Sequence, residues 1–462
     1  MESRSVVDQP RYRAYGRRHL DKLAKMGKLS REQLIALKAV SAVLPFRVND
    51  YVLGELIDWD DIPNDPIYQL TFPQAGMLGR ADFLRLQDLV VGGGNDEELL
   101  RLAREIQMRM NPNPGGQKLL NVPMVDGEKV PGCQHKYRET VLFFPVQGQS
   151  CHAYCTYCFR WAQFVGVKNL RFASREIDGL VRYLAEHDEV TDVLVTGGDP
   201  MVMNSRLLRR NIEPLLDPRL SHIRSIRIGT KSLAFWPHRF LTDPDADDLL
   251  RLFEQVRATG RQLAFMAHFS HPRELHTAAV QEAVRRILDT GAVIRCQAPL
   301  IRHVNDKAEV WAEMWRRQVA MGAIPYYLFV ERDTGPKQYF EVSLARTLRI
   351  FGNAYREVSG LARTVRGPSM SATPGKVLVD GVTTIHGEKV FVLKMVQGRD
   401  PEWANRVFFA RFDSQATWLD ELQPAFGEHQ FFFDPYIRAM YEGVWQPEWA
   451  RQAEDTGEEL TA

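Results

Sequence analysis

The segment Cys151-His-Ala-Tyr-Cys155-Thr-Tyr-Cys158 places three cysteines within eight residues. Thiolates are the usual protein ligands of iron–sulfur clusters, and a cubane cluster has four irons, so three ligands leave one iron open. A structural zinc site needs four closed ligands, and His152 is the only other ligand type inside this loop. Three unrelated core cysteines so close together would be improbable. The segment therefore predicts a [4Fe–4S] cluster held by these three thiolates.

The bulk composition is that of an ordinary globular protein. The 462 residues are 45% hydrophobic and 25% charged, with a formal net charge of +1, which suits two or three domains. The near-neutral balance predicts neither a nucleic-acid partner nor attraction to an anionic membrane surface. No apolar stretch is long enough to span a bilayer, and the first residues, Met1–Ser5, lack the apolar core of a signal peptide.

The other cysteines bear on the cellular compartment. Cys133 and Cys296 are isolated, so the five cysteines of the chain do not form a disulfide framework. Such usage is typical of proteins in a reducing compartment. An oxygen-sensitive cluster needs the same surroundings, and we therefore expect a cytoplasmic location.

Outward from the cysteines, the N-terminal part of the chain has helical patterns. Residues 1–120 are expected to be mostly helical, and Ser30-Arg-Glu-Gln33 is a capping box that opens an amphipathic segment. The run Asn111-Pro-Asn-Pro-Gly-Gly116 breaks any helix and is a candidate domain boundary.

Strands and helices alternate over residues 121–345. The apolar run Thr140–Val146 leads directly into the cysteine loop and predicts a buried strand. Ser174 is the expected cap of a helix after that loop. Two helices show the 3.6-residue period on one face, formed by Ile177, Leu180, Val181 and Leu184 and by Val280, Ala283, Val284 and Ile287. Five further strands are expected at Asp192–Thr196, Ser225–Ile228, Gln262–Met266, Val293–Ala298 and Tyr326–Val330.

Six strands with helical crossovers imply a parallel sheet with right-handed connections. Such a sheet is either open and doubly wound or a partial barrel. The cysteine loop follows the first strand, so the cluster would lie at the carboxyl ends of the strands, where barrel active sites are built. We therefore predict an α/β protein whose central domain, 121–345, is a partial (β/α)6 TIM-like barrel.

The C-terminal extension, 346–462, is expected to be irregular. Residues 408–449 are dense in Phe, Trp and Tyr, which indicates an additional packing layer over the barrel or a subunit contact. The acidic tail from Glu454 is expected to fray.

The spacing of the cysteines, with Tyr157 directly before the last one, resembles the signature of the radical S-adenosylmethionine (SAM) superfamily. In that superfamily the open iron is chelated by the amino and carboxylate groups of SAM, and the fold is a partial (β/α)6 barrel. The resemblance thus implies two cofactors, a [4Fe–4S] cluster and SAM.

Further motifs resemble the lysine 2,3-aminomutase family of radical SAM enzymes. They occur in the family's order over roughly residues 50 to 380, namely Asn64-Asp-Pro-Ile67, Val130-Pro-Gly132, His135-Lys-Tyr137, Asp192–Pro200, Arg227-Ile-Gly-Thr230, His268-Phe-Ser-His-Pro272, Val304-Asn-Asp306 and Pro325-Tyr-Tyr327. Alone, the turn Gly197-Gly198-Asp199 is common turn chemistry. The resemblance implies that this turn holds the SAM amino group and that Tyr157, His268 and Gln297 also lie at SAM. Taken by itself, His268 is as consistent with a hydrogen-bonded core histidine.

Two departures concern pyridoxal 5′-phosphate (PLP), the family's other cofactor, which binds a lysine as an imine. Matching Thr373-Pro374 to the family's Thr-Pro puts Ala372 where that lysine should be, and alanine cannot form an imine. Lys376 is the alternative PLP lysine, or a solvated turn residue. The family's phosphate-binding arginines correspond to Lys136 and Thr140, and a threonine cannot replace the bidentate fork of an arginine. Both departures count against PLP.

A third departure concerns the substrate. Lysine-specific members bind the distant ammonium of the substrate with two aspartates, and the matching positions here are Arg332 and Arg366. Arginines there would repel a lysine ammonium and attract a carboxylate or phosphate, with Lys136 as a further substrate contact. Asp333 would restore an acid if the register shifted by one residue, and surface salt bridging is the other interpretation of both arginines. The family's C-terminal zinc cysteines are missing, since no cysteine follows Cys296.

The predicted function is reductive cleavage of SAM, followed by removal of hydrogen from a small, anionic or amino-acid-like substrate. Without PLP, rearrangement, dehydrogenation or elimination would follow. With PLP, the family resemblance implies a 1,2-amino shift, as in an amino acid 2,3-aminomutase. The alternative from another class is a non-catalytic iron–sulfur sensor, although a sensor needs no SAM turn. The expected partners are the small-molecule substrate, a reductant such as flavodoxin or ferredoxin, and a second copy of the chain.

Overall fold

The computed structural model describes residues 10–25, 29–93 and 95–450. The sequence-based expectations for Met1–Ser5 and for the tail from Glu454 fall outside these ranges. No helix within the described part is long and apolar enough to cross a membrane.

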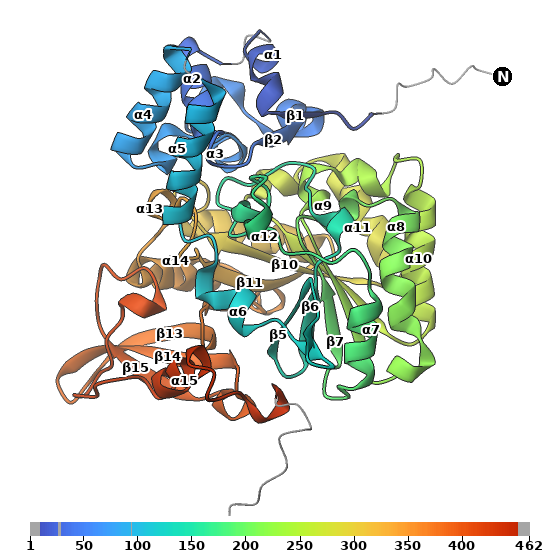
Figure 1. Cartoon of the computed structure of the whole chain (residues 1–462), viewed down its shortest axis with the longest axis vertical. Coiled ribbons are helices and arrows are strands. Elements are labelled where there is room, and N and C mark those ends of the chain that lie inside the picture. Colours follow the sequence, from blue (N-terminus) through green and yellow to red (C-terminus); the bar gives the residue numbers. More distant parts are fainter. Residues whose placement is uncertain (1–9, 26–28, 94, 451–462) are drawn as a thin grey trace, which may run out of the picture.

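One sheet of eleven strands forms the centre of the molecule, in the order β15-β14-β13-β12-β11-β10-β9-β8-β7-β6-β5 (Figure 1). The strands that pair in parallel are β6 (Thr140–Phe143), β7 (Asp192–Val195), β8 (Ser225–Thr230), β9 (Gln262–His268), β10 (Val293–Leu300), β11 (Ile324–Val330) and β12 (Arg366–Ser371). The antiparallel strands are β5 (Cys133–Tyr137), β13 (Gly375–Ile385), β14 (Glu388–Gly398) and β15 (Val407–Arg411).

The strand order decides between the two predicted architectures. From β6 to β12 each strand pairs with its successor in the chain, whereas a doubly wound sheet reverses direction at a switch point. The chain therefore winds one way only, which confirms the partial barrel. All six strands expected from sequence are present, within two residues at each end except for the first, which ends three residues earlier, at Phe143.

Burial alternates along the barrel strands. In β8 the side chains of Ile226, Ile228 and Thr230 are buried, while Arg227 and Gly229 between them keep accessible surface. In β10, Arg295 and Gln297 alternate with buried neighbours in the same way. Because residues at i and i+2 share one face of a strand, the accessible set lines the inside of the barrel and the buried set packs under the outer helices.

The helices that connect the barrel strands lie on the outside of the sheet (Figure 1). They are α7 (Asp178–Ala185), α8 (Ser205–Ile212), α9 (Ser232–Phe235), α10 (Ala246–Ala258), α11 (Ala278–Asp289), α12 (Ala308–Ala320), α13 (Lys337–Phe340) and α14 (Leu344–Arg356). The predicted inner face of α11 is confirmed, since Val280, Ala283, Val284 and Ile287 are all buried.

The expected start of α7 is wrong. Ser174 does not cap this helix, which begins at Asp178 after Ile177. The Ser174 backbone instead forms a bridge with the chain ahead of the cysteines, because its N–H donates to the Phe144 carbonyl at 2.8 Å. That bridge holds Ser174 in extended conformation, too early for a helix cap.

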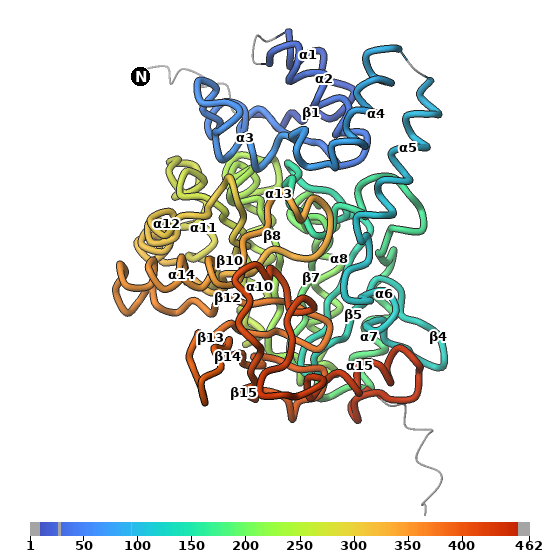
Figure 2. Tube along the Cα trace, turned by 90° about the vertical axis from the view of Figure 1, so that its left-hand side faces the viewer, coloured from blue at the N-terminus to red at the C-terminus, as the bar shows by residue number. Residues whose placement is uncertain are grey.

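The N-terminal region is mostly helical, as expected, and lies over one end of the barrel (Figures 1 and 2). Ser30 and Gln33 form the predicted capping box at α2. Its elements are β1 (Ala14–Gly16), α1 (Leu20–Lys25), α2 (Arg31–Val40), β2 (Arg47–Asn49), α3 (Pro66–Thr71), α4 (Arg80–Val91), α5 (Asp96–Arg109) and α6 (Gln117–Leu120), followed by the small hairpin of β3 (Met124–Val125) and β4 (Glu128–Lys129).

The C-terminal extension is not irregular, and that expectation is wrong. It continues the barrel sheet through β12 to β15 and ends in α15 (Asp434–Tyr441). Its aromatic residues pack into a second core that includes Trp403, Phe408, Phe431 and Phe433. The aromatic segment is thus a packing layer within the chain itself. The predicted boundary at residue 345 falls inside α14.

Candidate active site

The three clustered cysteines lie in the loop that leaves the carboxyl end of β6. The N-terminal region holds this loop through its backbone. Arg47 donates to the Cys151 carbonyl at 3.2 Å, Tyr154 N–H donates to the Arg47 carbonyl at 2.9 Å, and Thr156 N–H donates to the Leu70 carbonyl at 2.9 Å. The N-terminal region is therefore the support of the cysteine loop, a role that the sequence did not reveal.

The donor set of this loop fits a cubane cluster with one open iron. Burial raises the pKa of all three thiols, that of Cys158 to about 11, and the thiols of Cys155 and Cys158 also raise the pKa of Cys151. The cysteines are thus electrostatic neighbours that a metal must deprotonate. His152 does not join them, because its Nδ1 lies 2.8 Å from Ser232 Oγ in a buried contact. Among the described residues, no three His, Cys, Asp or Glu side chains are arranged to hold a single metal ion.

The turn Gly197-Gly198-Asp199, at the end of β7, packs directly on the cysteine loop. A Cβ atom at Gly197 would lie 2.1 Å from Gln149 Nε2, and one at Gly198 would lie 2.3 Å from the Ser150 carbonyl oxygen. Gly197 also has a φ of 144°, which favours glycine. The glycines are therefore required for contact between the two loops, in addition to any ligand they approach.

The Asp199 carboxylate is fully used inside the protein. It accepts hydrogen bonds from Met201 N–H at 2.9 Å, Thr230 Oγ1 at 2.7 Å, Lys231 N–H at 2.8 Å and Ser232 Oγ at 3.0 Å. These bonds tie the end of β7 to the end of β8. The structure thus gives Asp199 a positioning role, and the Gly197 carbonyl accepts a hydrogen bond from Arg160 at 2.9 Å.

His268 and Gln297 end neighbouring strands and contact each other. They are paired in the register of β9 and β10, and Gln297 Nε2 lies 2.8 Å from His268 Nε2. Burial, with Lys231 and Arg160 nearby, lowers the pKa of His268 to about 3. The imidazole is therefore neutral, accepts from the Gln297 amide at Nε2 and carries its proton on Nδ1.

A buried ion pair beside the cysteine loop was missed at the sequence level. Lys231 Nζ lies 2.7 Å from Glu274 Oε1, with side chains 11% and 0% exposed. Lys231 also donates to Ser270 Oγ at 3.2 Å, and Tyr157 OH lies 3.2 Å from the same hydroxyl. Tyr157 is thus fixed next to Cys155 and Cys158. Lys231 directly follows Thr230 of the Arg227–Thr230 motif. This place next to a motif is the sequence feature that could have identified Lys231 as a residue of the site.

A contact between β5 and the turn from β12 to β13 closes the barrel. Lys136 donates from Nζ to the Ala372 carbonyl, and Arg399 donates from Nε to the Thr373 carbonyl at 2.8 Å. The Lys136–Ala372 contact joins residues 236 positions apart in the chain, whereas Arg399 follows β14 and binds a residue 26 positions away. We call the side chains Lys136, Arg332 and Lys376 the closing wall, since the charge of Lys136 acts on both others.

The closing wall does not fit the family's PLP site. Ala372 is buried and its carbonyl is occupied by Lys136. Thr140 Oγ1 donates to Asp192 at 2.9 Å, so its hydroxyl proton is already used inside the protein. Neither the imine-forming residue nor the phosphate-binding pair is therefore present at the positions that the resemblance implies.

Lys376 is not a solvated turn lysine, which corrects one of the two sequence interpretations. It lies on β13 opposite Ser371 and Gln397, with its ammonium nitrogen 4.7 Å from the ring centre of Tyr327 and 5.7 Å from that of Tyr137. Burial, with Arg227 and Arg366 nearby, lowers the pKa of Lys376 to about 7. The side chain still keeps some accessible surface, and we place that surface inside the barrel.

The two predicted substrate arginines do not meet. Arg366 is exposed and bonds Tyr327 OH at 3.2 Å, level with the middle of β11. Arg332 follows the end of β11, roughly 15 Å further along the strand direction. Its guanidinium lies 5.4 Å from the ring centre of Phe159, beside Cys158, and its side chain is 17% exposed. Of the predicted substrate residues, only Arg332 is therefore placed next to the cysteine loop, and Lys136 is its electrostatic neighbour.

Asp333 does not replace Arg332 inside the barrel. Its Oδ2 accepts from Asn111 Nδ2 at 3.1 Å, and its Oδ1 is 3.9 Å from Arg332 Nε. The predicted boundary segment Asn111–Gly116 thus covers this loop, because Asn111 also binds Thr334 and Gly115 approaches Arg332.

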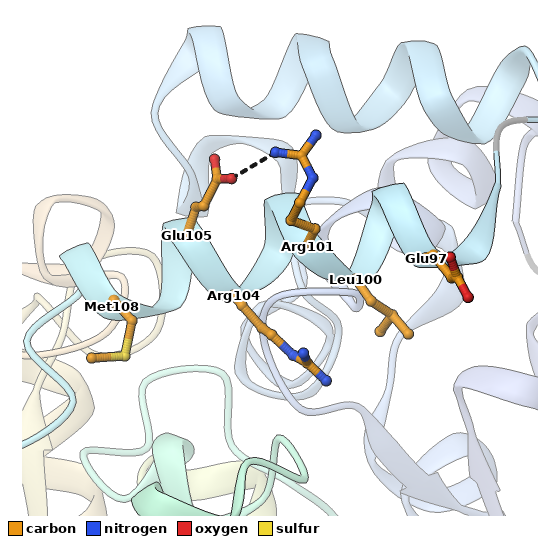
Figure 3. A pocket seen from close by; sticks show the side chains of 6 residues that line it. All are labelled: Glu97, Leu100, Arg101, Arg104, Glu105 and Met108. Atoms are coloured by element: carbon orange, nitrogen blue, oxygen red, sulfur yellow. Dashed lines mark hydrogen bonds and ion pairs between the residues drawn. The ribbon is translucent and has the colours of Figure 1, made fainter.

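A surface hollow lies away from this site, along α5 in the N-terminal region (Figure 3). It is formed by one helix face that includes Leu100, Met108 and the Arg101–Glu105 ion pair of 2.9 Å. A second hollow lies around Gln147, Arg210 and Gln255. Neither hollow contains a residue predicted to bind a cofactor or substrate.

The fold and the site together define a class of protein. A singly wound partial barrel with three cysteines in the loop after its first parallel strand is the arrangement that the resemblance to radical SAM proteins implies. The chain is 29% identical over 404 residues to a protein of Aquifex aeolicus named "Putative L-lysine 2,3-aminomutase", which covers 87% of this chain and 94% of that protein. It is 27% identical over 233 residues to L-lysine 2,3-aminomutase of Fusobacterium nucleatum, covering 50% of this chain and 51% of the relative.

Glutamate 2,3-aminomutase of Clostridioides difficile is 25% identical over 343 residues, covering 74% of this chain and 69% of the relative. Among solved structures, a radical SAM methyltransferase from Sphaerobacter thermophilus gives a TM-score of 0.35 at 17% identity, covering 53% of this chain and 71% of that one. No protein-family model matches the chain. The sequence relatives confirm the predicted resemblance: the chain is similar to proteins named lysine 2,3-aminomutase and glutamate 2,3-aminomutase at 25–29% identity.

Proposed function

We propose that this protein cleaves SAM reductively at a [4Fe–4S] cluster and removes hydrogen from a small anionic substrate without using PLP. The observation that carries the proposal is the combination of two features in one barrel. One is the three-cysteine loop, and the other is the closing wall of cations, which lacks the family's PLP residues and approaches the cysteine loop at Arg332. When bound, the cluster and SAM together supply the electron and the 5′-deoxyadenosyl radical.

At the cysteine end, each residue has a distinct task in this proposal. Cys151, Cys155 and Cys158 hold the cluster. Backbone carbonyls of the turn Gly197-Gly198 bind the SAM ammonium. Asp199 fixes that turn by accepting hydrogen bonds from four donors. His268, Gln297 and Tyr157 bind the adenosyl part. His268 is suited to a neutral ligand because it offers a hydrogen bond without a charge.

At the closing wall, Arg332 and Lys136 bind the negative group of the substrate. An arginine can hold a carboxylate through two parallel hydrogen bonds, and Arg332 Nε is buried without a hydrogen-bond partner. Arg332 lies beside Phe159, next to Cys158, so a substrate held there is close to the radical source. Arg366, further along the barrel, would contact only a longer anionic substrate.

The reaction after hydrogen removal is a rearrangement, dehydrogenation or elimination. The electron comes from a small reductant such as flavodoxin or ferredoxin, in the cytoplasm. Self-association of the chain remains a prediction.

The test is formation of 5′-deoxyadenosine. Protein purified without oxygen and reconstituted with iron and sulfide should convert SAM to methionine and 5′-deoxyadenosine when dithionite is added. No 5′-deoxyadenosine under any reducing condition, with the cluster intact by its absorbance, would overturn the proposal and favour the iron–sulfur sensor.

A PLP-dependent amino acid 2,3-aminomutase is the second candidate, because the named relatives have that activity and one of them acts on glutamate. The two candidates differ in a simple property. Purified protein that carries an imine absorbance band, lost on borohydride treatment and restored by PLP, would favour the aminomutase and contradict PLP independence.

A further inference from the structure

Lys376 is a buried amine that has no role in the cluster, SAM or substrate binding proposed above. No described side chain forms a hydrogen bond or a carboxylate ion pair with its Nζ, and its contacts are the ring faces of Tyr327 and Tyr137. The nearest acid is Asp192, which is already occupied. Arg227 binds both of its oxygens, with Nε at 2.8 Å from Oδ1, and Thr140 adds a third donor. The amine is therefore enclosed but not neutralised.

The groups that face Lys376 come from every neighbouring strand. They are Lys136 and Tyr137 from β5, Asp192 from β7, Arg227 from β8, Tyr327 from β11 and Arg366 from β12. Cations outnumber carboxylates in this set. Buried like charges that lack a counter-ion are costly, so an anion is the ligand that completes the site, and the ammonium form of Lys376 is disfavoured until it arrives.

An amine in such surroundings is a nucleophile. Lysine becomes reactive when it is desolvated or placed next to another cation, because both effects leave more of the amine unprotonated. Its natural electrophile is a carbonyl carbon. The neighbouring cations would gather an anionic compound, and the aromatic faces of Tyr327 and Tyr137 leave the nitrogen lone pair unoccupied.

We propose that Lys376 forms an imine with an anionic carbonyl compound, such as a 2-oxo acid or a carboxylate-bearing aldehyde. Nζ attacks the carbonyl carbon, a C–N bond forms, and the carbonyl oxygen leaves as water together with the two amine hydrogens. No oxidant or reductant is required. The inference rests on the proposed function in one respect, that the small substrate of this barrel is anionic.

The experiment traps the imine with cyanoborohydride in the full-length protein. Glyoxylate, the smallest carboxylate-bearing aldehyde, is the probe, and acetaldehyde is its uncharged counterpart. Hydride addition converts the imine to a stable secondary amine, which peptide mass spectrometry assigns to a residue. We expect Lys376 to be tagged by glyoxylate at concentrations at least ~10-fold below those at which acetaldehyde tags it, the scale of one charge-assisted hydrogen bond.

Two variants serve as controls. Lys376→Arg keeps the positive charge and the length but should lose the tag at this position. Lys389→Arg removes an exposed lysine of β14 and should leave tagging of Lys376 unchanged. Tagging of Lys376 should increase as the pH rises through about 7, whereas exposed lysines should respond nearer to 10.4. Wild-type protein with native circular dichroism whose exposed lysines are tagged while Lys376 is not would overturn the inference.

The source of the carbonyl is resolved by a third arm with PLP as the probe. Tagging of Lys376 by PLP in preference to glyoxylate would support the imine but assign it to a cofactor, against the proposed PLP independence. Formation of 5′-deoxyadenosine is measured separately on wild-type protein. An absent tag with intact SAM cleavage sinks only the Lys376 inference, and absent SAM cleavage with an intact tag sinks only the proposed function.

Discussion

The cysteine end of the barrel and the closing wall differ in how their buried charges are matched. At the cysteine end, Lys231 is paired with Glu274 and the Asp199 carboxylate accepts from four donors. At the closing wall, Lys136 binds only a carbonyl oxygen, and Lys376 has no acidic partner among the described side chains. One region is internally complete before its ligands arrive, while the other requires an anion. We infer that the radical source is generic and that the closing wall selects the substrate.

The largest expected effect is at the cysteine end. Cys155→Ala should abolish cluster assembly and reduce 5′-deoxyadenosine formation by more than ~100-fold. Loss of a contact in the outer shell of a metal site already costs up to that factor, and Cys155 is a direct ligand. Iron content and the visible absorbance of the reconstituted protein check this outcome. Cys296→Ala, in the core of β10, is the matched control and should keep the cluster. A Cys155→Ala protein that still cleaves SAM would break the assignment of the cysteine end.

The second effect tests the unmatched charge of the closing wall. The pKa of Lys376 is lowered to about 7 in the folded state, so between pH 7 and the usual lysine value the unfolded chain binds more protons than the native protein. Stability should therefore rise with pH across that window, by up to about 1.4 kcal/mol per pH unit, and the destabilisation is fully present below pH 7. Lys376→Met should remove this dependence and be more stable than wild type at pH 7. Urea unfolding at several pH values measures the free energy of unfolding of both proteins. The same dependence on pH in wild type and Lys376→Met would contradict the prediction.

The third effect concerns the close packing of the two loops at the cysteine end. Gly198→Ala places a methyl group against the Ser150 backbone, and overpacking of this kind costs roughly 1–3 kcal/mol or more. Gly352→Ala in α14 has no heavy atom within 4 Å of the new methyl group and should stabilise the protein by about 0.5–1 kcal/mol. Thermal unfolding compares the two variants. Equal melting temperatures would show that the turn does not depend on this contact.

The fourth effect sharpens the substrate side of the comparison. If Arg332 binds the carboxylate of the substrate, Arg332→Met should weaken binding of a carboxylate ligand by about 1.5–3 kcal/mol, the scale of hydrogen bonds to charged groups. Isothermal titration with L-glutamate measures the change, since a relative acts on glutamate. Arg346→Met, which breaks an exposed ion pair with Asp306, is the control. Unchanged affinity in Arg332→Met would move the anion site elsewhere.

The smallest effect is expected at the neutral imidazole. The pKa of His268 is lowered to about 3 in the native protein, so the unfolded chain takes up a proton first as the pH falls below about 6.5. The free energy of unfolding should therefore fall progressively as the pH decreases from about 6.5 to about 3. His268→Gln keeps an acceptor for Gln297 and should reduce the loss between pH 7 and 5 by roughly 1–2 kcal/mol. Urea unfolding at both pH values measures it, and an unchanged loss would indicate a charged imidazole.

Much of the barrel could be predicted because its signals are local. The apolar runs at Asp192–Thr196 and Gln262–Met266 are bounded by turns, and both became strands of the parallel sheet. The alternation Val377, Val379 and Phe391, Leu393, Met395 in β13 and β14 was an equally clear strand pattern. The dense aromatic composition masks this alternation, so the expectation of an irregular extension is wrong.

The candidate site was less accessible to sequence reasoning. The sequence placed Arg332 and Arg366 in one site because both match acidic positions of the family. The register of β11 and β12 separates them, since Arg366 pairs beside Tyr327. The Lys231–Glu274 ion pair joins two loops of the barrel, and no local pattern marks such a contact.

The sequence by itself determined the cysteine loop, the strand–helix alternation and the alanine at position 372, where the family resemblance implies a lysine, because each depends on which residue type stands at a given spacing. Only the tertiary structure decided what faces that position. Closure of the barrel brings β5 against the turn between β12 and β13, which occupies the Ala372 carbonyl with Lys136 and encloses Lys376 between Tyr137 and Tyr327. Burial and neighbouring charge then lower the pKa of an ordinary lysine. These effects act through space, so they arise only after distant strands have met.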